Sequence, residues 1–157
     1  MENRDPTLCR SFVTFAKSFL AVHPEVWHQW VIDADEDHAT LSLSGSENGF
    51  EVFVEIWPDS ITIFAAGAHR HFETDCSTVP EIVSEAISMI HDLLGPGTRV
   101  IEYLAGGHPY RWKIEFLNSG NWVTVDRTRL FFYRYFSIRS RRVLSNSVLP
   151  MREREMN

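Results

Sequence analysis

One amphipathic segment, residues 78–96, constrains the fold of this chain more than any other feature. Thr78 and Glu81 have the spacing of a helix capping box, in which each side chain bonds to the other residue's backbone N–H. Gly95, expected in the left-handed conformation, and Pro96 would end the helix. The apolar stripe of this helix comprises Val79, Ile82, Val83, Ala86, Ile90, Leu93 and Leu94. So broad a stripe needs an apolar sheet or helix to pack against.

The pattern before this segment predicts that partner to be a sheet. In residues 39–44 and 50–57, every second side chain is apolar, and residues 61–65 form another short strand-like run. A repeat of two residues is the period of a β-strand. Asn48-Gly49 is a hairpin-turn signal, and Pro58-Asp59 turns the chain again. We therefore expect a meander of antiparallel strands between residues 26 and 73.

Two further regions complete the expected elements. An N-terminal helix is predicted, with Asp5 as N-cap, Pro6 at the first helical position and an end at His23-Pro24. Its core face would be Leu8, Phe12, Phe15, Ala16 and Phe19. After the second helix, the sequence predicts a strand at 99–104, a loop at 105–109, a hairpin of 110–116 with 122–126, and a strand at 130–138.

These elements indicate one α+β domain over residues 1–150, with a flexible charged tail at 151–157. We expect an antiparallel sheet of about six to eight strands packed against two helices. The chain has 157 residues, of which 44% are hydrophobic, so it is long and apolar enough to form a core and is not a disordered chain. Ile82, Val83, Ala86, Ile90 and Leu93 should pack against Leu41, Val52, Val54 and Trp112.

The sequence also suggests a compartment. The N-terminus lacks the basic and apolar regions of a secretory signal, and the apolar stretch 12–22 contains Lys17 and is too short to cross a bilayer. We expect a cytoplasmic protein whose Cys9 and Cys76 stay reduced, with no membrane partner and no cofactor.

Charge is divided along the chain. Residues 1–95 carry 16 acidic and 4 basic side chains, whereas residues 96–157 carry 5 acidic and 11 basic ones. Such asymmetry either marks surfaces for charged partners or is neutralised where the two halves pack together, and the second interpretation is slightly favoured.

The acidic half contains the first candidate site. Asp33, Asp35, Glu36 and Asp37 begin like a calcium loop, but the required Gly and Glu positions are His38 and Ser44. An acidic hairpin turn is the better interpretation. The predicted partner-binding residues are Asp33, Asp35, Glu36, Asp37, Glu51 and Glu55.

His69 and His71 are the second candidate site. On a strand, both imidazoles would project from one face, about 7 Å apart, which is a spacing that two metal ligands can bridge. Glu73, Asp75 and Cys76 follow and offer further ligands. The pattern matches no established zinc spacing, so a metal-binding protein or metal-dependent enzyme is retained as the alternative function.

The third candidate is the basic C-terminal segment. Arg134, Arg139, Arg141 and Arg142 alternate with aromatic residues, a mixture that holds single-stranded nucleic acid. The net charge of −6 opposes phosphate binding, so a solvated and salt-bridged segment is the favoured interpretation.

Several of these segments resemble small bacterial immunity-type proteins associated with polymorphic or contact-dependent toxins. The resemblance covers about the last hundred residues. It rests on Ile61-Thr62-Ile63, His69-Arg70-His71-Phe72, the capped helix, Pro109-Tyr110-Arg111-Trp112 and Leu130-Phe131-Phe132-Tyr133. It implies an inhibitor that neutralises a cognate toxin by binding it, with no catalytic residues. Together with the acidic half, it suggests a non-enzymatic protein-binding module that recognises a basic toxin domain, such as a nuclease, through an acidic and aromatic surface.

Overall fold

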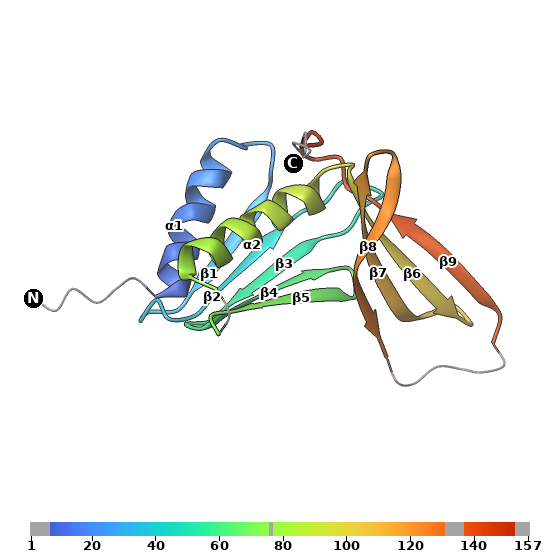
Figure 1. The fold of residues 1–157 in the computed structure, drawn as a ribbon, viewed down its shortest axis with the longest axis horizontal. Coiled ribbons are helices and arrows are strands. Elements are labelled where there is room, and N and C mark those ends of the chain that lie inside the picture. The colour runs from blue at the N-terminus through green and yellow to red at the C-terminus, as the bar shows by residue number, and fades with distance from the viewer. Residues whose placement is uncertain (1–6, 76, 131–136, 153–157) are drawn as a thin grey trace, which may run out of the picture.

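The computed structural model of the chain has two helices and nine strands, the strands lying in two antiparallel sheets (Figure 1). It describes residues 7–75, 77–130 and 137–152. The α+β class is confirmed, as is the packing of antiparallel strands against two helices. The described strands divide between a five-stranded sheet, here sheet A, and a four-stranded sheet, sheet B.

Sheet A is the expected meander. Its strands, in spatial order, are β1 (His28–Ile32), β2 (Ala39–Leu43), β3 (Val52–Ile56), β4 (Ser60–Ala65) and β5 (Ala68–Glu73). Each strand pairs with the next through a short connection, as the alternating pattern and the turn signals predicted.

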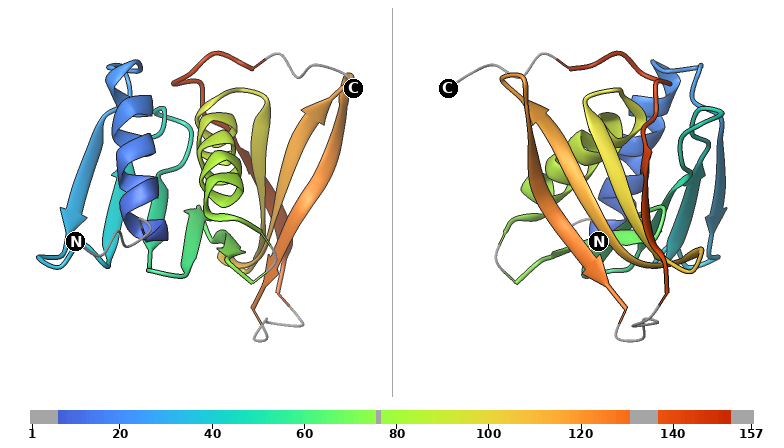
Figure 2. Two further views of the ribbon diagram at one scale, coloured as in Figure 1. Left: turned by 60° about the vertical axis from the view of Figure 1, so that its left-hand side comes forward. Right: turned by 90° about the vertical axis from the view of Figure 1, so that its right-hand side faces the viewer.

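Both helices lie on the same face of sheet A (Figures 1 and 2). Helix α1 (Leu8–Ala21) has Thr7 as its N-cap, and the Thr7 hydroxyl accepts a hydrogen bond from the Arg10 N–H at 3.4 Å. The predicted cap residues Asp5 and Pro6 lie outside the described residues. Phe15 is 59% exposed, so its assignment to the core face was wrong. The buried face is rotated and consists of Leu8, Cys9, Phe12, Ala16 and Leu20.

Helix α2 (Val79–Leu94) begins as predicted but ends differently. The Glu81 carboxylate accepts hydrogen bonds from the Thr78 backbone N–H at 2.9 Å and from the Thr78 hydroxyl at 2.8 Å. Gly95 is extended, with φ −103°, and is not the left-handed residue that was predicted. The backbone N–H groups of Val148 and Leu149 both donate to the Leu94 carbonyl, at 2.9 and 3.1 Å. A distant segment therefore caps the helix, and a left-handed glycine is not needed there.

The core lies between α1, α2 and the covered face of sheet A. All the predicted α2 contacts, Ile82, Val83, Ala86, Ile90 and Leu93, are buried in one cluster with Leu41, Val52, Val54 and Trp112. No helix in the described part of the chain is both long and apolar enough to cross a membrane.

Sheet B follows α2 and has the spatial order β8-β7-β6-β9. Its strands are β6 (Thr98–Ala105), β7 (His108–Asn118), β8 (Asn121–Arg129) and β9 (Arg139–Leu144). The predicted loop 105–109 is only a tight turn at Gly106 and Gly107, whose φ values of 57° and 81° are accessible to glycine at little cost.

Strand β9 was not predicted. Of the strand predicted at 130–138, residues 131–136 lie outside the described residues, and the described remainder is not in a strand. Residues 139–144 were assigned to a solvated segment because their charges dominate the pattern. In the structure they form an edge strand, where charged side chains are common.

The two sheets meet where β5 lies beside β7 and β8. Trp112 fills this junction: a Cβ added at Gly67 would lie 2.2 Å from its ring, so only glycine fits there. The indole N–H of Trp112 donates to the buried Glu102 carboxylate at 2.9 Å, and Arg142 pairs with the second oxygen of that carboxylate. This side of sheet B faces α2, and its opposite side faces away (Figure 2, right).

The C-terminal segment ties the layers together through Asn146, which is 1% exposed. Its Oδ1 accepts from the Ser46 and Phe50 N–H groups, and its Nδ2 donates to the Phe50 and Leu93 carbonyls. Within the predicted tail 151–157, Arg152 contacts α2, and residues 153–157 lie outside the described residues.

Candidate functional site

The face of sheet A opposite the helices is the first candidate surface, called here the open face. Directly paired residues on neighbouring strands project to the same side of a sheet, so the strand register identifies its members. Two rows cross it, namely Thr40, Glu55, Thr62 and His71, and Ser42, Phe53, Phe64 and His69. In the described part of the chain, both helices pack on the other side.

An aromatic band runs across the middle of the open face. The ring centroids of Phe53 and Phe64 are 5.9 Å apart, those of Phe64 and His69 are also 5.9 Å apart, and those of His69 and His71 are 5.0 Å apart. Phe53, Phe64 and His69 are half-buried by one another and by the neighbouring strands. The solvent-exposed side of each ring is thus available to a partner.

The acidic turn, residues 33–38, lies at one end of the open face and joins β1 to β2. The Asp33 N–H donates to the His38 carbonyl and the Glu36 N–H to the Asp33 carbonyl, both at 3.0 Å. This is the hairpin turn that was preferred over a calcium loop. Arg10 on α1 lies 3.5 Å from the Glu36 carboxylate, so Glu36 is partly neutralised.

His38 connects the turn to the open face. Its Nδ1 lies 3.3 Å from an Asp33 carboxylate oxygen, and its Nε2 lies 3.8 Å from a Glu55 oxygen. Its ring packs at a tilt of 39° against Trp57, with centroids 4.2 Å apart, and Trp57 is 44% exposed. Acidic and aromatic side chains therefore meet at this end of the sheet.

The structure brings together five of the six predicted partner-binding residues. Asp33, Asp35, Glu36, Asp37 and Glu55 lie at the turn end of sheet A. Glu51 precedes β3 at the opposite end of the open face, four residues or about 13 Å along the strand from Glu55. Strands β1 to β4 contain no Lys or Arg, so cations on the strands do not offset these carboxylates.

The two histidines lie on β5, as the metal-site interpretation requires, but further ligands do not converge on them. The His71 Nδ1 is within 2.8 Å of the Thr62 hydroxyl, to which it is hydrogen-bonded. Within residues 7–75, 77–130 and 137–152, no group of three or more His, Cys, Asp or Glu side chains is arranged to hold a metal ion. Cys76 lies outside these ranges.

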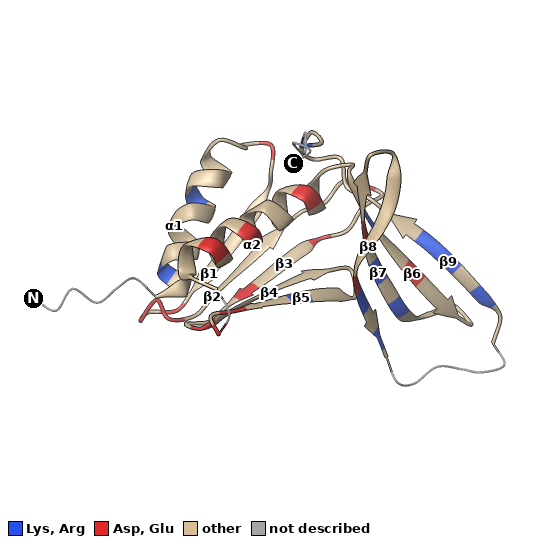
Figure 3. Cartoon of the chain, in the orientation of Figure 1, with Lys and Arg blue, Asp and Glu red and all other residues tan. Residues whose placement is uncertain are grey.

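Positive charge gathers on sheet B (Figure 3). Its strands carry eight Lys or Arg and three acidic residues, whereas the strands of sheet A carry one Arg. Glu102 and Glu115 pair with cations of sheet B itself, and Arg152–Asp92 joins the two halves of the sequence. Among the described residues, the charge division along the sequence is thus largely a division in space as well, although Arg152–Asp92 is an ion pair between the two halves. These contacts do not support the slightly favoured interpretation that the halves neutralise one another.

The arginines predicted as nucleic-acid ligands have different environments. Arg142 is held by the buried Glu102 on the side facing α2, whereas Arg141 is exposed on the opposite side. The Arg139 guanidinium lies 4.9 Å from the centre of the Tyr110 ring. Arg134 lies outside the described residues.

Sequence reasoning missed the basic residues of the β7–β8 hairpin. Arg111 and Lys113, and likewise Arg127 and Arg129, are two residues apart, so each pair projects from one face of its strand. This alternation was a visible signal. Whether the two pairs share a face depends on the strand register, which the sequence does not specify.

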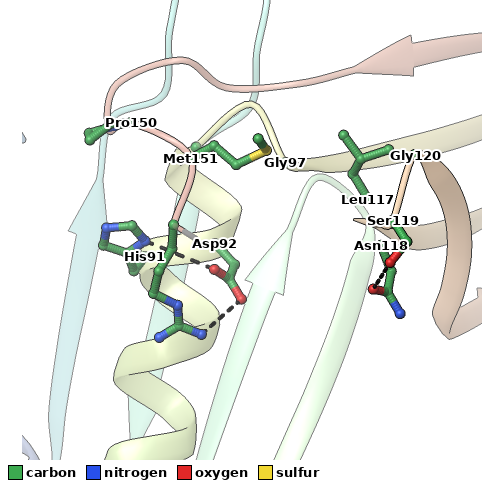
Figure 4. Close-up of a pocket in the computed structure, with 11 residues that line it drawn as sticks. His91, Asp92, Gly97, Leu117, Asn118, Ser119, Gly120, Pro150 and Met151 are labelled. Carbon is green, nitrogen blue, oxygen red and sulfur yellow. Dashed lines mark hydrogen bonds and ion pairs between the residues drawn. The ribbon is translucent and has the colours of Figure 1, made fainter. Parts of the chain in front are cut away.

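A pocket of about 440 Å³ lies between the C-terminal end of α2 and the β7–β8 turn (Figure 4). Its lining includes His91, Asp92, Leu117 and Met151. The Arg152 guanidinium donates to the Ser88 hydroxyl at 3.1 Å and to the Asp92 carboxylate at 3.4 Å. The side chains of Ser88, Asp92 and Arg152 are thus bonded to one another, and these bonds hold the C-terminal segment against α2.

His91 lines this pocket, and its pKa is lowered in the fold. Burial disfavours the charged imidazolium and lowers the pKa of His91, and the nearby charges of Arg152 and His23 act in the same direction. The Asp92 carboxylate opposes them in part. The His91 ring also packs edge-on against Phe19 and His23, with centroids 6.2 and 5.9 Å away.

Comparison of the chain with models of known families, with curated proteins and with solved structures gives no match. The geometry and charge of the surfaces described above are therefore the basis for assigning a function to this protein.

Proposed function

We propose that this protein is a non-enzymatic binding module that recognises a basic protein through the open face of sheet A and its acidic turn. In this proposal it acts as an immunity-type inhibitor, and its partner is a toxin domain such as a nuclease. The supporting observation is the uncovered band of Phe53, Phe64 and His69, bordered by the carboxylates of Glu55 and the acidic turn.

The aromatic band supplies the apolar centre that such an interface needs. Protein interfaces combine a central patch rich in aromatic residues with a polar rim, and truncation of a few central side chains removes most of the binding energy. Phe53 and Phe64 are held by the sheet, so little side-chain entropy is lost when a partner covers them. Thr40 and Ser42 border them with hydroxyl groups that can pair with a partner's backbone.

The acidic turn supplies attraction and orientation. A nuclease presents a positive cleft to its substrate, and clustered carboxylates accelerate association with such a surface. Because the cations of sheet B lie in another part of the molecule, they do not screen the turn over the Debye length of about 8 Å at physiological ionic strength. The proposal thus assigns affinity to the aromatic band and association rate to the turn.

The test is binding to the products of neighbouring genes. Each product is purified, and its affinity for the full chain is measured by calorimetry. We expect one basic partner whose binding weakens at least tenfold in Phe53→Ala/Phe64→Ala, and whose association slows in Asp35→Lys/Asp37→Lys. Glu85→Lys, an exposed charge change on α2, is the matched control and should leave binding within twofold.

Two outcomes would count against the proposal. One is that no neighbouring product binds at low or physiological salt. The other is a partner whose affinity and association rate are insensitive to both double variants, because that partner would use another surface. Circular dichroism of each variant separates lost binding from lost folding.

A further inference from the structure

The face of sheet B that points away from α2 carries a second, oppositely charged surface. The paired residues Arg141, Tyr103, Arg111 and Arg129 form one row across the four strands, and Val143, Ile101, Lys113 and Arg127 form the next. Arg99 lies two residues beyond Ile101 on the same side. We call Arg99, Arg111, Lys113, Arg127, Arg129 and Arg141 the cationic face.

Two β-bulges create this convergence. Near the β7–β8 turn, Asn118 pairs with Asn121, and continuing that register would place Lys113 opposite Asp126. A register shift between Ile114 and Glu115 advances β8 by one residue, so Lys113 faces Arg127. A one-residue shift moves every following side chain to the other side of a strand.

The second bulge acts on β6 and β7 in the same way. The register of Ala105 with His108 would place Arg111 opposite Glu102, where the two charges would pair. The shift between Tyr103 and Leu104 places Arg111 opposite Tyr103 instead. Without the bulges, Lys113 and Arg111 would each face a carboxylate. With them, Lys113 faces Arg127 and Arg111 faces Tyr103.

At least four of the six cations of the cationic face are not neutralised by acidic side chains of the described residues. Arg99 pairs with Glu115, at 2.7 Å. Arg111, Lys113, Arg127 and Arg141 form no ion pair with an acidic side chain in the part of the chain that the structure describes. Holding like charges side by side costs energy that an anionic ligand would recover.

Aromatic rings hold several of these cations in place. The Arg111 guanidinium and the Lys113 ammonium lie 5.0 and 5.7 Å from the centre of the Tyr103 ring. The Arg99 guanidinium lies 4.1 Å from the centre of the Trp122 ring. A guanidinium stacked on a ring keeps its N–H groups directed outward, where they can bind phosphate oxygens in pairs.

We propose that the cationic face binds single-stranded nucleic acid. Five of its six cations are Arg, the residue best matched to phosphate, and Tyr103 and Trp122 lie among them as they do in stacking platforms. A four-stranded sheet about 14 Å wide suits a flexible strand, because the major groove of a duplex admits a helix or a two-stranded ribbon.

The negative net charge argued against nucleic acid at the level of the sequence. That objection is weaker in the fold, because only three of the described acidic residues, Glu102, Glu115 and Asp126, lie on the strands of sheet B. Most of the others lie on sheet A, on α2 or in the acidic turn, on the far side of α2 or beside it (Figure 3). This surface meets the open face of sheet A at the β5–β8 junction, where Arg127 and Arg129 line one pocket with His69 and His71. Arg111, Arg141, Phe53 and Phe64 do not line that pocket, so variants at these positions test the two proposals separately.

The test measures binding of a labelled 20-nucleotide single-stranded oligonucleotide, as DNA and as RNA, by fluorescence anisotropy in 50 mM salt. We expect binding that weakens with salt, with a slope of log affinity against log salt of about −2 to −3.5, as three to five neutralised phosphates predict. Arg111→Glu/Arg141→Glu should weaken it at least tenfold, and Arg111→Gln/Arg141→Gln should do so to a smaller extent. Lys17→Glu, an exposed charge change on α1, should stay within twofold.

The proposal is overturned if neither oligonucleotide binds in 50 mM salt, or if the variants bind as wild type does. Equal or tighter binding of poly-glutamate, abolished by the same variants, would instead identify an acidic protein as the occupant. Salt-sensitive self-association in light scattering, lost in the same variants, would identify the acidic surface of a second copy. Unfolding curves of every variant verify that the sheet is intact.

Discussion

The side-chain amide of Asn146 and the backbone of Phe50 form a reciprocal pair of hydrogen bonds across 96 residues of sequence, at 3.0 and 3.1 Å. The same amide donates to the last turn of α2 at Leu93. One buried side chain thus joins the β2–β3 connection, α2 and the segment that follows sheet B.

Replacing Asn146 should be among the most destabilising single changes in the chain. Asn146→Ala leaves the N–H and C=O groups of Phe50 and the Leu93 carbonyl buried without this partner, and each unsatisfied group costs about 1–3 kcal/mol. We expect a loss of about 3–5 kcal/mol in the free energy of unfolding, measured in urea. Asn121→Ala, at the exposed first residue of β8, is the control and should change it by less than about 0.5 kcal/mol.

Two substitutions in helix α2 compare how much its core packing and its N-terminal cap contribute to the free energy of unfolding. Ile90 is 1% exposed in the core, so Ile90→Ala should cost about 2–5 kcal/mol through lost burial and the cavity it leaves. Thr78→Ala removes one side of the capping box at an exposed helix end and should cost about 1 kcal/mol. If urea unfolding shows the two variants to be equally harmful, α2 is not the central packing element inferred here.

Arg141 and Arg142 are neighbours on β9, but replacing each with Ala should lower the free energy of unfolding by different amounts. Arg142→Ala leaves the buried Glu102 carboxylate with only the Trp112 indole and should cost about 1–3 kcal/mol, a value reduced because Arg142 is itself largely exposed. Arg141→Ala should cost less than about 0.5 kcal/mol, because its side chain is on the exposed side. Thermal unfolding of the two variants measures this directly. A larger loss in Arg141→Ala would contradict the register of β9.

His91 should make stability depend on pH near neutrality. Its pKa in the folded chain lies below the ordinary value of 6.5, chiefly because burial disfavours the imidazolium. As the pH falls through 6.5, the unfolded chain takes up a proton that the folded chain does not, so stability falls until the lower, folded pKa is passed. Between pH 7.5 and 5.5, unfolding curves should therefore show a greater loss of stability in wild type than in His91→Gln. Equal losses would mean that His91 titrates normally in the fold.

The elements that the sequence predicted correctly are those whose signals are local. The capping box of Thr78 and Glu81, the apolar stripe of α2 and the alternation in sheet A depend on neighbouring residues, and the structure contains all of them. The acidic turn was identified for the same reason.

The errors arise where distant segments decide the outcome. Gly95 is extended because Val148 and Leu149 bond to the end of α2, and no pattern around Gly95 indicates that contact. Phe15 has the spacing of a core residue, but α1 packs through a rotated face. The cationic face depends on bulges, which add one residue without a distinctive sequence, so the separate arginines could be noticed but their convergence could not.

The bulge in the β7–β8 hairpin also bears on how such a protein can change through evolution. Val125 is the residue of β8 that pairs with no residue of β7, so loss of its codon would leave a regular ladder with the same partners, Lys113 with Arg127 and Arg111 with Arg129. Keeping all of β8 but losing the bulge would instead continue the register of the turn, placing Lys113 opposite Asp126 and moving Arg127 and Arg129 to the other side of the sheet. A one-residue deletion in this hairpin can thus preserve the cationic face, whereas a change of register alone would invert it.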